Sequence, residues 1–240
     1  MNLANSFLVT LAVCGVAGSI YVADQHVDTR HSLIVSRRIA RSDHTMIAFK
    51  NAFFKQSAAR ILEQGELDMS SLALDMSRHE KDFPITYVWG GSIKNHLSGL
   101  DCTGFIHGLM YYLGYPESNR RFNTKGIYLK LRRDTRWETL HDSAQTDEAL
   151  DATRLRVGDV IVWPSDLDDG RNLPGPIWGH IGVVTQDQGR LLVTHYVHSD
   201  AYDALDVIGP TGPGINTLPA ADFIRLKQRG LLGVFRKFVD

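Results

Sequence analysis

The chain has 240 residues, of which 43% are hydrophobic and 22% are charged, so it can bury one good core and a smaller attachment. Its formal net charge of −1 provides no basic excess, which argues against a nucleic-acid-binding protein. The two cysteines, Cys14 and Cys102, lie in segments of very different character, so a disulfide framework is not expected.

The first feature along the chain is an uncharged, mostly apolar run at Ser6–Ala23. Its length suits a short membrane span or the apolar part of a signal sequence. Arg30 and Arg37 follow it, and taken alone these charges would keep that side in the cytoplasm. A buried helix of a globular domain is the alternative, but no polar face interrupts the run. We therefore expect residues 1–25 to export the chain or to attach it to a membrane, and leave cleavage and orientation open.

Two helices are expected next. Ser42–Gly65 has Ser42 or Asp43 as a cap at its start and a glycine at its end. Its apolar side chains form one stripe that favours packing against the rest of the chain: Met46, Ile47, Phe49, Phe53, Phe54, Ala58, Ile61 and Leu62. Met69–His79 is predicted to be a shorter helix that ends before Pro84, because the residue before a proline avoids helical angles.

The central stretch is Tyr87–Tyr115, with the sequence YVWGGSIKNHLSGLDCTGFIHGLMYYLGY. Its second half predicts a helix with apolar residues on one face: Phe105, Ile106, Leu109, Met110 and Leu113. Cys102 therefore lies at the first turn, where unpaired N–H groups and the helix dipole lower the pKa of a thiol. Most free cysteines are small buried hydrophobes. Because Cys102 is flanked by Asp101 and Thr103 and not by core residues, we interpret it as a nucleophile.

Three segments of mixed character follow the predicted cysteine helix. Pro116–Asp151 is polar and is predicted to be irregular. Its basic patch, Lys130–Arg133, is interpreted as solvated surface, with contact to an anionic polymer as the alternative. Leu155–Pro164 predicts a strand. Asp166–Trp178 begins like a calcium-binding loop but lacks the closing glutamate, so an exposed loop is expected.

Two histidine-bearing strands are predicted at Gly179–Val184 and Arg190–Val197, joined by a tight turn as an antiparallel hairpin. Such a hairpin brings a histidine near the end of the second strand beside His180. A four-residue loop would pair His195 with His180, whereas a three-residue loop would favour the face of His198. The register stays open at this point.

These residues suit thiol-dependent amide hydrolysis. A thiolate attacks a carbonyl, a histidine holds its proton and later gives it to the leaving amine, and a third polar group fixes the tautomer of that histidine. Cys102, His180 and one of His195 or His198 can supply the three parts. A metal site made of the three histidines is a poor alternative, because residues three apart on a strand point to opposite faces. We expect no metal and no cofactor.

Four short segments resemble the NlpC/P60 cysteine peptidase family. Tyr87–Gly91, Gly99–Phe105, Gly158–Asp159 and Gly179–Val183 are similar to its motifs and occur in the family's order. The resemblance covers roughly residues 68–240. It implies an α+β, papain-like fold, in which a helix bearing the nucleophilic cysteine packs on an antiparallel β-sheet bearing the histidines. The histidine hairpin is longer than is common in the family.

The resemblance also implies roles for single residues. Cys102 would be the nucleophile and His180 the general base, and Tyr87 would be the tyrosine whose hydroxyl lies near the nucleophile and the oxyanion. The third member of the triad can be placed in two ways. Some relatives end the second strand in a pattern that suits His195, which we prefer, and others in a Val-His-Ser pattern that suits His198.

Three further residues are expected to meet the substrate. Asp101 matches a position that binds the substrate's free amine in some members of the family. Thr103 stands where the family usually has serine, and it keeps the hydroxyl. Trp89, in the first motif, is the third residue that we expect in the substrate site.

The implied activity is hydrolysis of amide bonds in peptidoglycan stem peptides by a cysteine endopeptidase. We expect a signal or anchor segment at 1–25, a helical extension at 26–67 and a monomeric catalytic domain at 68–240. The protein would be periplasmic or extracytoplasmic, with the N-terminal segment as a membrane contact. The alternatives are a thiol-dependent amidase or acyltransferase of the same fold with another substrate, and a catalytically silent cell-wall-binding module.

Overall fold

The computed structural model describes residues 29–83, 85–116, 122–165, 179–197, 214–225 and 231–238 and, except at residue 225, their side chains from residue 45 onward. The chain divides into two compact units, Met1–Ile39 and Ala40–Asp240, with the boundary inside helix α1 (Thr29–Leu62). The apolar run Ser6–Ala23 lies outside the described residues. None of the helices in the described part is long and apolar enough to cross a membrane.

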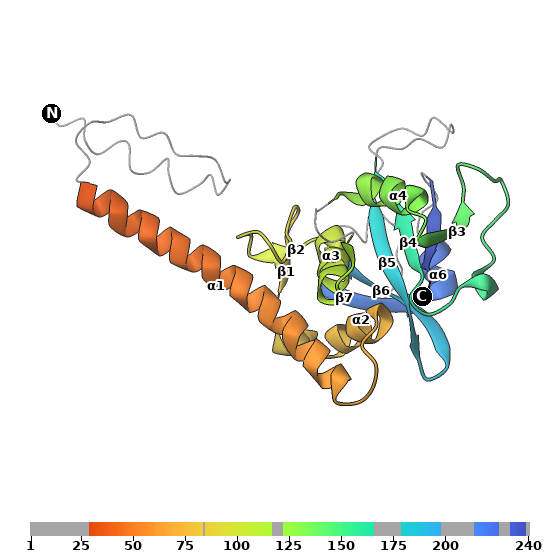
Figure 1. Ribbon diagram of the computed structural model, residues 1–240, viewed down its shortest axis with the longest axis horizontal. Coiled ribbons are helices and arrows are strands. Elements are labelled where there is room, and N and C mark those ends of the chain that lie inside the picture. The colour runs from red at the N-terminus through yellow and green to blue at the C-terminus, as the bar shows by residue number, and fades with distance from the viewer. Residues whose placement is uncertain are drawn as a thin grey trace. The chain divides into compact units, whose positions relative to one another are not determined.

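The second unit is a mixed α+β structure built on an antiparallel sheet (Figure 1). The six strands described in that sheet lie side by side in the order β3 (Trp137–Asp142), β8 (Gly233–Lys237), β4 (Val160–Trp163), β5 (His180–Asp187), β6 (Arg190–Val197) and β7 (Gly214–Pro219). Two short parallel strands, β1 (Thr86–Tyr87) and β2 (Gly99–Leu100), form a separate pair. The remaining elements are α2 (Met69–Arg78), η3 (Glu80–Asp82), α3 (Cys102–Tyr112), α4 (Thr124–Arg133), η5 (Ala152–Arg154) and α6 (Ala220–Arg225).

Successive side chains of the central strands point to opposite faces of the sheet and enter two different cores. On β5, Ile181 and Val183 join the larger core, to which α1, α2, α3 and α4 also contribute buried residues. Val184 points the other way and joins the smaller core, which contains Phe223 of α6. Helix α3 packs against β5 and β6 (Figure 1), so the segment that begins with Cys102 lies on the face of the sheet that carries the larger core.

Helix α1 extends further toward the N-terminus than the sequence predicts. The helix continues through Ser42, so the prediction of a cap there is wrong. The predicted stripe does pack against the rest of the chain, because Phe53 and Phe54 are buried in the larger core. The Phe54 ring occupies the space above Gly108, where an added Cβ would lie 2.3 Å from it. Residues of α1 from Phe49 onward therefore share the larger core with α3, across the predicted boundary at residue 67.

The prediction that Pro116–Asp151 is irregular is wrong, because it contains α4 and β3. The Asn123 side chain caps α4 by accepting the Gly126 N–H at 2.8 Å. Only a few apolar residues of α4 are buried, among them Tyr128 and Leu131. With so few apolar positions between lysines and arginines, the helical periodicity is faint. The basic patch Lys130–Arg133 forms the last turn of this helix.

Candidate active site

Three glycines bring the loop before Cys102 against the start of α3. A Cβ added at Gly104 would lie 1.9 Å from the Gly91 carbonyl oxygen, and one at Gly99 would lie 1.8 Å from the Thr86 carbonyl oxygen. A Cβ at Gly91 would in turn lie 2.4 Å from the Gly99 carbonyl oxygen. No side chain fits at such distances, so these glycines are required for close backbone approach. The Gly-Gly and Asp-Cys-Thr-Gly motifs thus form one packed unit.

Asp101 is the N-cap of α3 and ties that unit together. Its Oδ1 accepts the Gly104 N–H at 2.6 Å and the Thr103 hydroxyl at 2.7 Å. Its Oδ2 accepts the Gly90 N–H at 2.9 Å. Both Asp101 and Thr103 are buried. This geometry gives the two side chains a structural role, beside the substrate contact that the family resemblance implies for them.

Cys102 begins α3, as the sequence predicts, and it contacts Tyr87. It is buried in the larger core, so the expectation that it lies apart from core residues is wrong. The pairing of β1 with β2 sets Tyr87 opposite Leu100, two residues before the cysteine. The Tyr87 hydroxyl forms hydrogen bonds with the side chain and the backbone of Cys102. Burial, followed by the negative charges of Cys102 and Asp101, raises the pKa of Tyr87 far above its usual value of 10.0. The phenol therefore stays protonated and can donate a hydrogen bond at any working pH.

Other aromatic rings hold Tyr87 in place. The Tyr196 ring, from β6, stacks on it with centroids 5.6 Å apart, and the Tyr196 hydroxyl donates to the Ile85 carbonyl. Trp89 meets Tyr87 edge-on with centroids 5.5 Å apart. Tyr196 is buried, whereas Trp89 is 58% exposed. Trp89 therefore offers an apolar surface to solvent beside the start of α3.

The two histidines of the hairpin form a hydrogen-bonded pair. Nε2 of His180 lies 2.9 Å from Nδ1 of His195. The turn between β5 and β6 has two residues, Gln188 and Gly189, with φ of 47° and 77°, as a type I′ turn requires. Both expected loop lengths are therefore wrong, and His195 pairs across the sheet with Gly182, diagonal to His180 on the same face. His198 lies outside the described residues.

This histidine pair is enclosed by aromatic side chains. Trp163 stacks beside His180, and the Phe223 ring contacts both histidines. The absence of a side chain at Gly182 leaves room for Phe223, since an added Cβ would lie 2.9 Å from that ring. Burial, and then the nearby charge of His180, lower the pKa of His195 well below its usual value of 6.5. His195 is therefore a neutral imidazole at neutral pH.

The far ring nitrogen of His195, Nε2, is buried and lies without a hydrogen-bond partner among the residues that the structure describes. Since Nδ1 faces His180, one tautomer places the proton on this unpartnered Nε2 and leaves Nδ1 to accept the N–H of His180. That tautomer suits a group that orients its neighbour.

The cysteine and the histidines lie on connected elements. Cys102 contacts Tyr87, Tyr87 stacks on Tyr196, and Tyr196 follows His195 directly on β6. The histidines, however, point to the sheet face that carries Phe223. His180 is the first residue of β5, so its ring lies at the end of the sheet.

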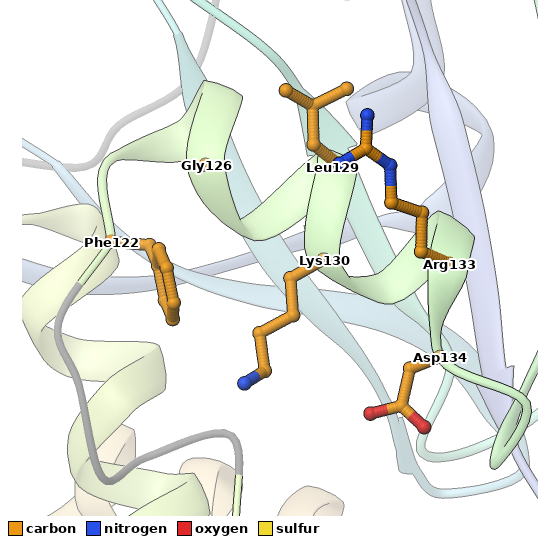
Figure 2. Close-up of a pocket in the computed structure, with 6 residues that line it drawn as sticks. All are labelled: Phe122, Gly126, Leu129, Lys130, Arg133 and Asp134. Carbon is orange, nitrogen blue, oxygen red and sulfur yellow. The ribbon is translucent and has the colours of Figure 1, made fainter.

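A separate pocket of about 520 Å³ lies along α4 (Figure 2). It is lined by Phe122, Gly126, Leu129, Lys130, Arg133 and Asp134. Figure 2 shows the ring of Phe122 and the side chain of Lys130 extending into it, and the Lys130 Nζ lies 5.2 Å from the ring centroid. Asp134 is ion-paired with Arg136 at 2.5 Å. None of the predicted site residues lines this pocket, although the Phe122 N–H donates to the Nε2 of His107 on α3 at 2.9 Å.

The sequence patterns do not single out several residues that shape the site. Tyr196, Trp163 and Phe223 position or cover the predicted groups, and each looks like an ordinary core aromatic in the sequence. Lys50 is fully buried. The one indication of this in the sequence is that it falls on the apolar stripe of its helix, three residues after Ile47.

No protein-family model, curated protein or solved structure matches the chain. Within the described ranges, no group of three or more His, Cys, Asp or Glu side chains could hold a metal ion. What the protein does must therefore be inferred from its own residues.

Proposed function

We propose that the protein is a cysteine hydrolase that cleaves amide bonds in peptidoglycan stem peptides, with Cys102 as nucleophile, His180 as general base and His195 as the group that orients it. The observation that carries the proposal is the 2.9 Å hydrogen bond between His180 and His195. One of these histidines opens the strand of the Gly-His-Ile-Gly motif. The packing of α3 on β5 and β6 supports the papain-like arrangement implied by the NlpC/P60 resemblance.

In the first half of the reaction, Cys102 attacks the carbonyl carbon of the scissile amide. The proton of the thiol passes to Nδ1 of His180, and the amide oxygen becomes negative in the tetrahedral intermediate. In this proposal the hydroxyl of Tyr87 and the backbone N–H of Cys102, which lie next to each other, stabilise that oxygen. His180 then gives its proton to the leaving amine, and a thioester remains on Cys102.

In the second half, water attacks the thioester carbon. His180 takes a proton from the water, the carbon–sulfur bond breaks, and the carboxylic acid product leaves as the thiol of Cys102 is restored. In the tautomer that this mechanism requires, the Nε2–H of His180 donates to Nδ1 of His195, 2.9 Å away. This bond keeps the other ring nitrogen of His180 toward the reacting groups. Since His195 is neutral, it orients His180 without adding negative charge.

The proposal sets a geometric requirement. His180 points to the face of the sheet that carries Phe223, whereas α3 packs on the opposite face. The proton transfer from Cys102 must therefore take place past the end of the sheet, where β5 begins. This transfer requires the histidine to be the first residue of its strand, as His180 is in β5.

The substrate assignment rests on the family resemblance together with the apolar N-terminus. Peptidoglycan lies outside the cytoplasmic membrane, so the proposal includes export or membrane attachment through residues 1–25 and a periplasmic or extracytoplasmic catalytic domain. Trp89, exposed beside Tyr87, would contact the peptide. In this proposal Asp101 and Thr103 shape the site by holding the first turn of α3.

The test is to incubate the purified chain with defined muropeptides and to follow the products by mass. A Cys102→Ala variant is the control. We expect new amine and carboxylate ends from the unaltered chain and none from the variant. Equal cleavage by the variant would remove the mechanism, and thiol-dependent hydrolysis of other amides alone would move the assignment to another substrate.

A further inference from the structure

Lys50 of α1 is completely buried, and its ammonium group lies against the loop that precedes Cys102. Its Nζ is 2.5 Å from the carbonyl oxygen of Ser92, 2.6 Å from that of Leu97 and 2.8 Å from that of Asn95. A lysine ammonium has three N–H donors, so these three oxygens match its full capacity. The carbonyl oxygen of Gly99 lies further out, at 3.4 Å.

The loop needs such donors because it has little backbone pairing of its own. Residues 92–98 contain turns and bends but no helix or strand, and buried carbonyl groups without hydrogen-bond donors are costly. The neighbouring Asn51 of α1 also contributes, since its Nδ2 donates to the Ile93 carbonyl at 3.0 Å. Helix α1 therefore replaces the hydrogen bonds that regular structure would supply.

Burying this lysine is unfavourable, which calls for a reason. Burial lowers the pKa of Lys50 from 10.5 to about 8, and no carboxylate forms an ion pair with it among the described residues. An apolar side chain on the same stripe would avoid this desolvation. The lysine is useful in this place because it can bind three converging carbonyl oxygens at once.

The loop connects the Gly91 turn to β2 and the start of α3. Its first end lies against the active-site unit, where the Gly91 carbonyl closely approaches Gly104. Asn95 crosses the loop and donates from Nδ2 to the Gly90 carbonyl at 2.7 Å. Loss of the Lys50 contacts would therefore loosen the backbone that fixes Tyr87 beside Cys102.

We propose that Lys50 is a positioning residue for the Cys102 site, because its ammonium group binds the carbonyl oxygens of Ser92, Asn95 and Leu97 and so sets the geometry of the loop that precedes Cys102. The inference rests on the proposed function for its kinetic readout, but the loop geometry can be tested without any substrate. A consequence is that the catalytic unit includes the part of α1 that bears Lys50, and does not begin at residue 68.

The experiment compares Lys50→Met with Lys55→Met in the full chain. Methionine has an unbranched side chain one atom shorter than that of lysine and removes its charge and donors. Lys55 is an exposed lysine on the same helix. In Lys50→Met, amide hydrogen exchange of residues 92–99 should quicken by at least about tenfold while β5 and β6 keep their protection. The kcat should fall by about 10- to 100-fold with KM within about threefold, because small misplacements of reacting groups are costly.

Hydrogen exchange and the rate of Cys102 alkylation by iodoacetamide separate this inference from the proposed function. If the unaltered chain cleaves no muropeptide, the proposed function fails, and these two readouts still decide the role of Lys50. Exchange and alkylation that match the Lys55→Met control would overturn the inference. Should Lys50→Met not fold, Lys50→Gln, which keeps a neutral donor, takes its place, and wild-type loop protection in that variant would overturn it equally.

Discussion

Replacing Asp101 tests whether this carboxylate shapes the site or binds the substrate. Asp101→Ala removes the acceptor of three protein hydrogen bonds, from Gly104, Thr103 and Gly90. Loss of an N-cap costs about 1 kcal/mol, and each of the two further hydrogen bonds is worth about 1 kcal/mol net. With some relaxation of the loop, we expect the free energy of unfolding to fall by about 3 kcal/mol.

Urea unfolding at pH 7.5, followed by circular dichroism, measures this change. Asp151→Ala is the matched control, because Asp151 likewise accepts a backbone N–H and a hydroxyl from Thr153 but lies on the surface. We expect that control to shift the unfolding midpoint much less. The opposite result is an Asp101→Ala variant that is as stable as the control but has a selectively raised KM. In that case the three hydrogen bonds of Asp101 do not stabilise the fold, and the substrate-binding role implied by the family resemblance is the better account.

Three further predictions address the histidine pair, the glycine contacts and the tyrosine. The pKa of His195 in the folded chain lies below its unfolded value of 6.5, so between these two pKa values the unfolded chain binds more protons than the folded chain. The free energy of unfolding should therefore fall as the pH drops below about 6.5. Urea midpoints at pH 7.5 and 5 should differ less in His195→Asn, and an unchanged difference would refute the assignment. Gly104→Ala should prevent folding, whereas Gly65→Ala, with nothing within 4 Å of the added Cβ, should leave the melting temperature nearly unchanged; comparable melting of both variants would contradict the close packing. Tyr87→Phe should lower kcat by about 10- to 1000-fold with little change in stability, and full activity would show that the hydroxyl has no part in the reaction.

Local patterns in the sequence predict the elements that carry the candidate site. The start of α3 near Cys102 follows from the helical period of the apolar residues after it. The strand Arg190–Val197 has the predicted bounds. In both cases the information lies within a dozen neighbouring residues, so no distant contact is needed to identify the element.

The register of the hairpin could not be obtained in the same way. A two-residue turn requires positive φ at Gln188, and glutamine is not a residue that marks such a conformation. The strand pairing, and not the turn sequence, selects this register. It sets His195 against Gly182, where the missing side chain makes room for Phe223.

The contribution of α1 also depends on distant contacts. Lys50 bonds to carbonyl groups more than 40 residues away, and nothing in its own neighbourhood indicates them. Strands β7 and β8 are absent from the predicted elements for a similar reason. They are completed by pairing with β6, β3 and β4, so their identity depends on the assembled sheet.

The central claim is that His180 shares a proton with Cys102, and the pH dependence of Cys102 alkylation tests it most directly. The rate of reaction with iodoacetamide is measured from pH 4 to 10 in the unaltered chain and in His180→Ala. An ion pair with His180 predicts a midpoint well below the ordinary thiol pKa of about 8.5, and a return toward that value in the variant. Identical profiles for the two proteins would contradict the pairing and, with it, the proposed hydrolase.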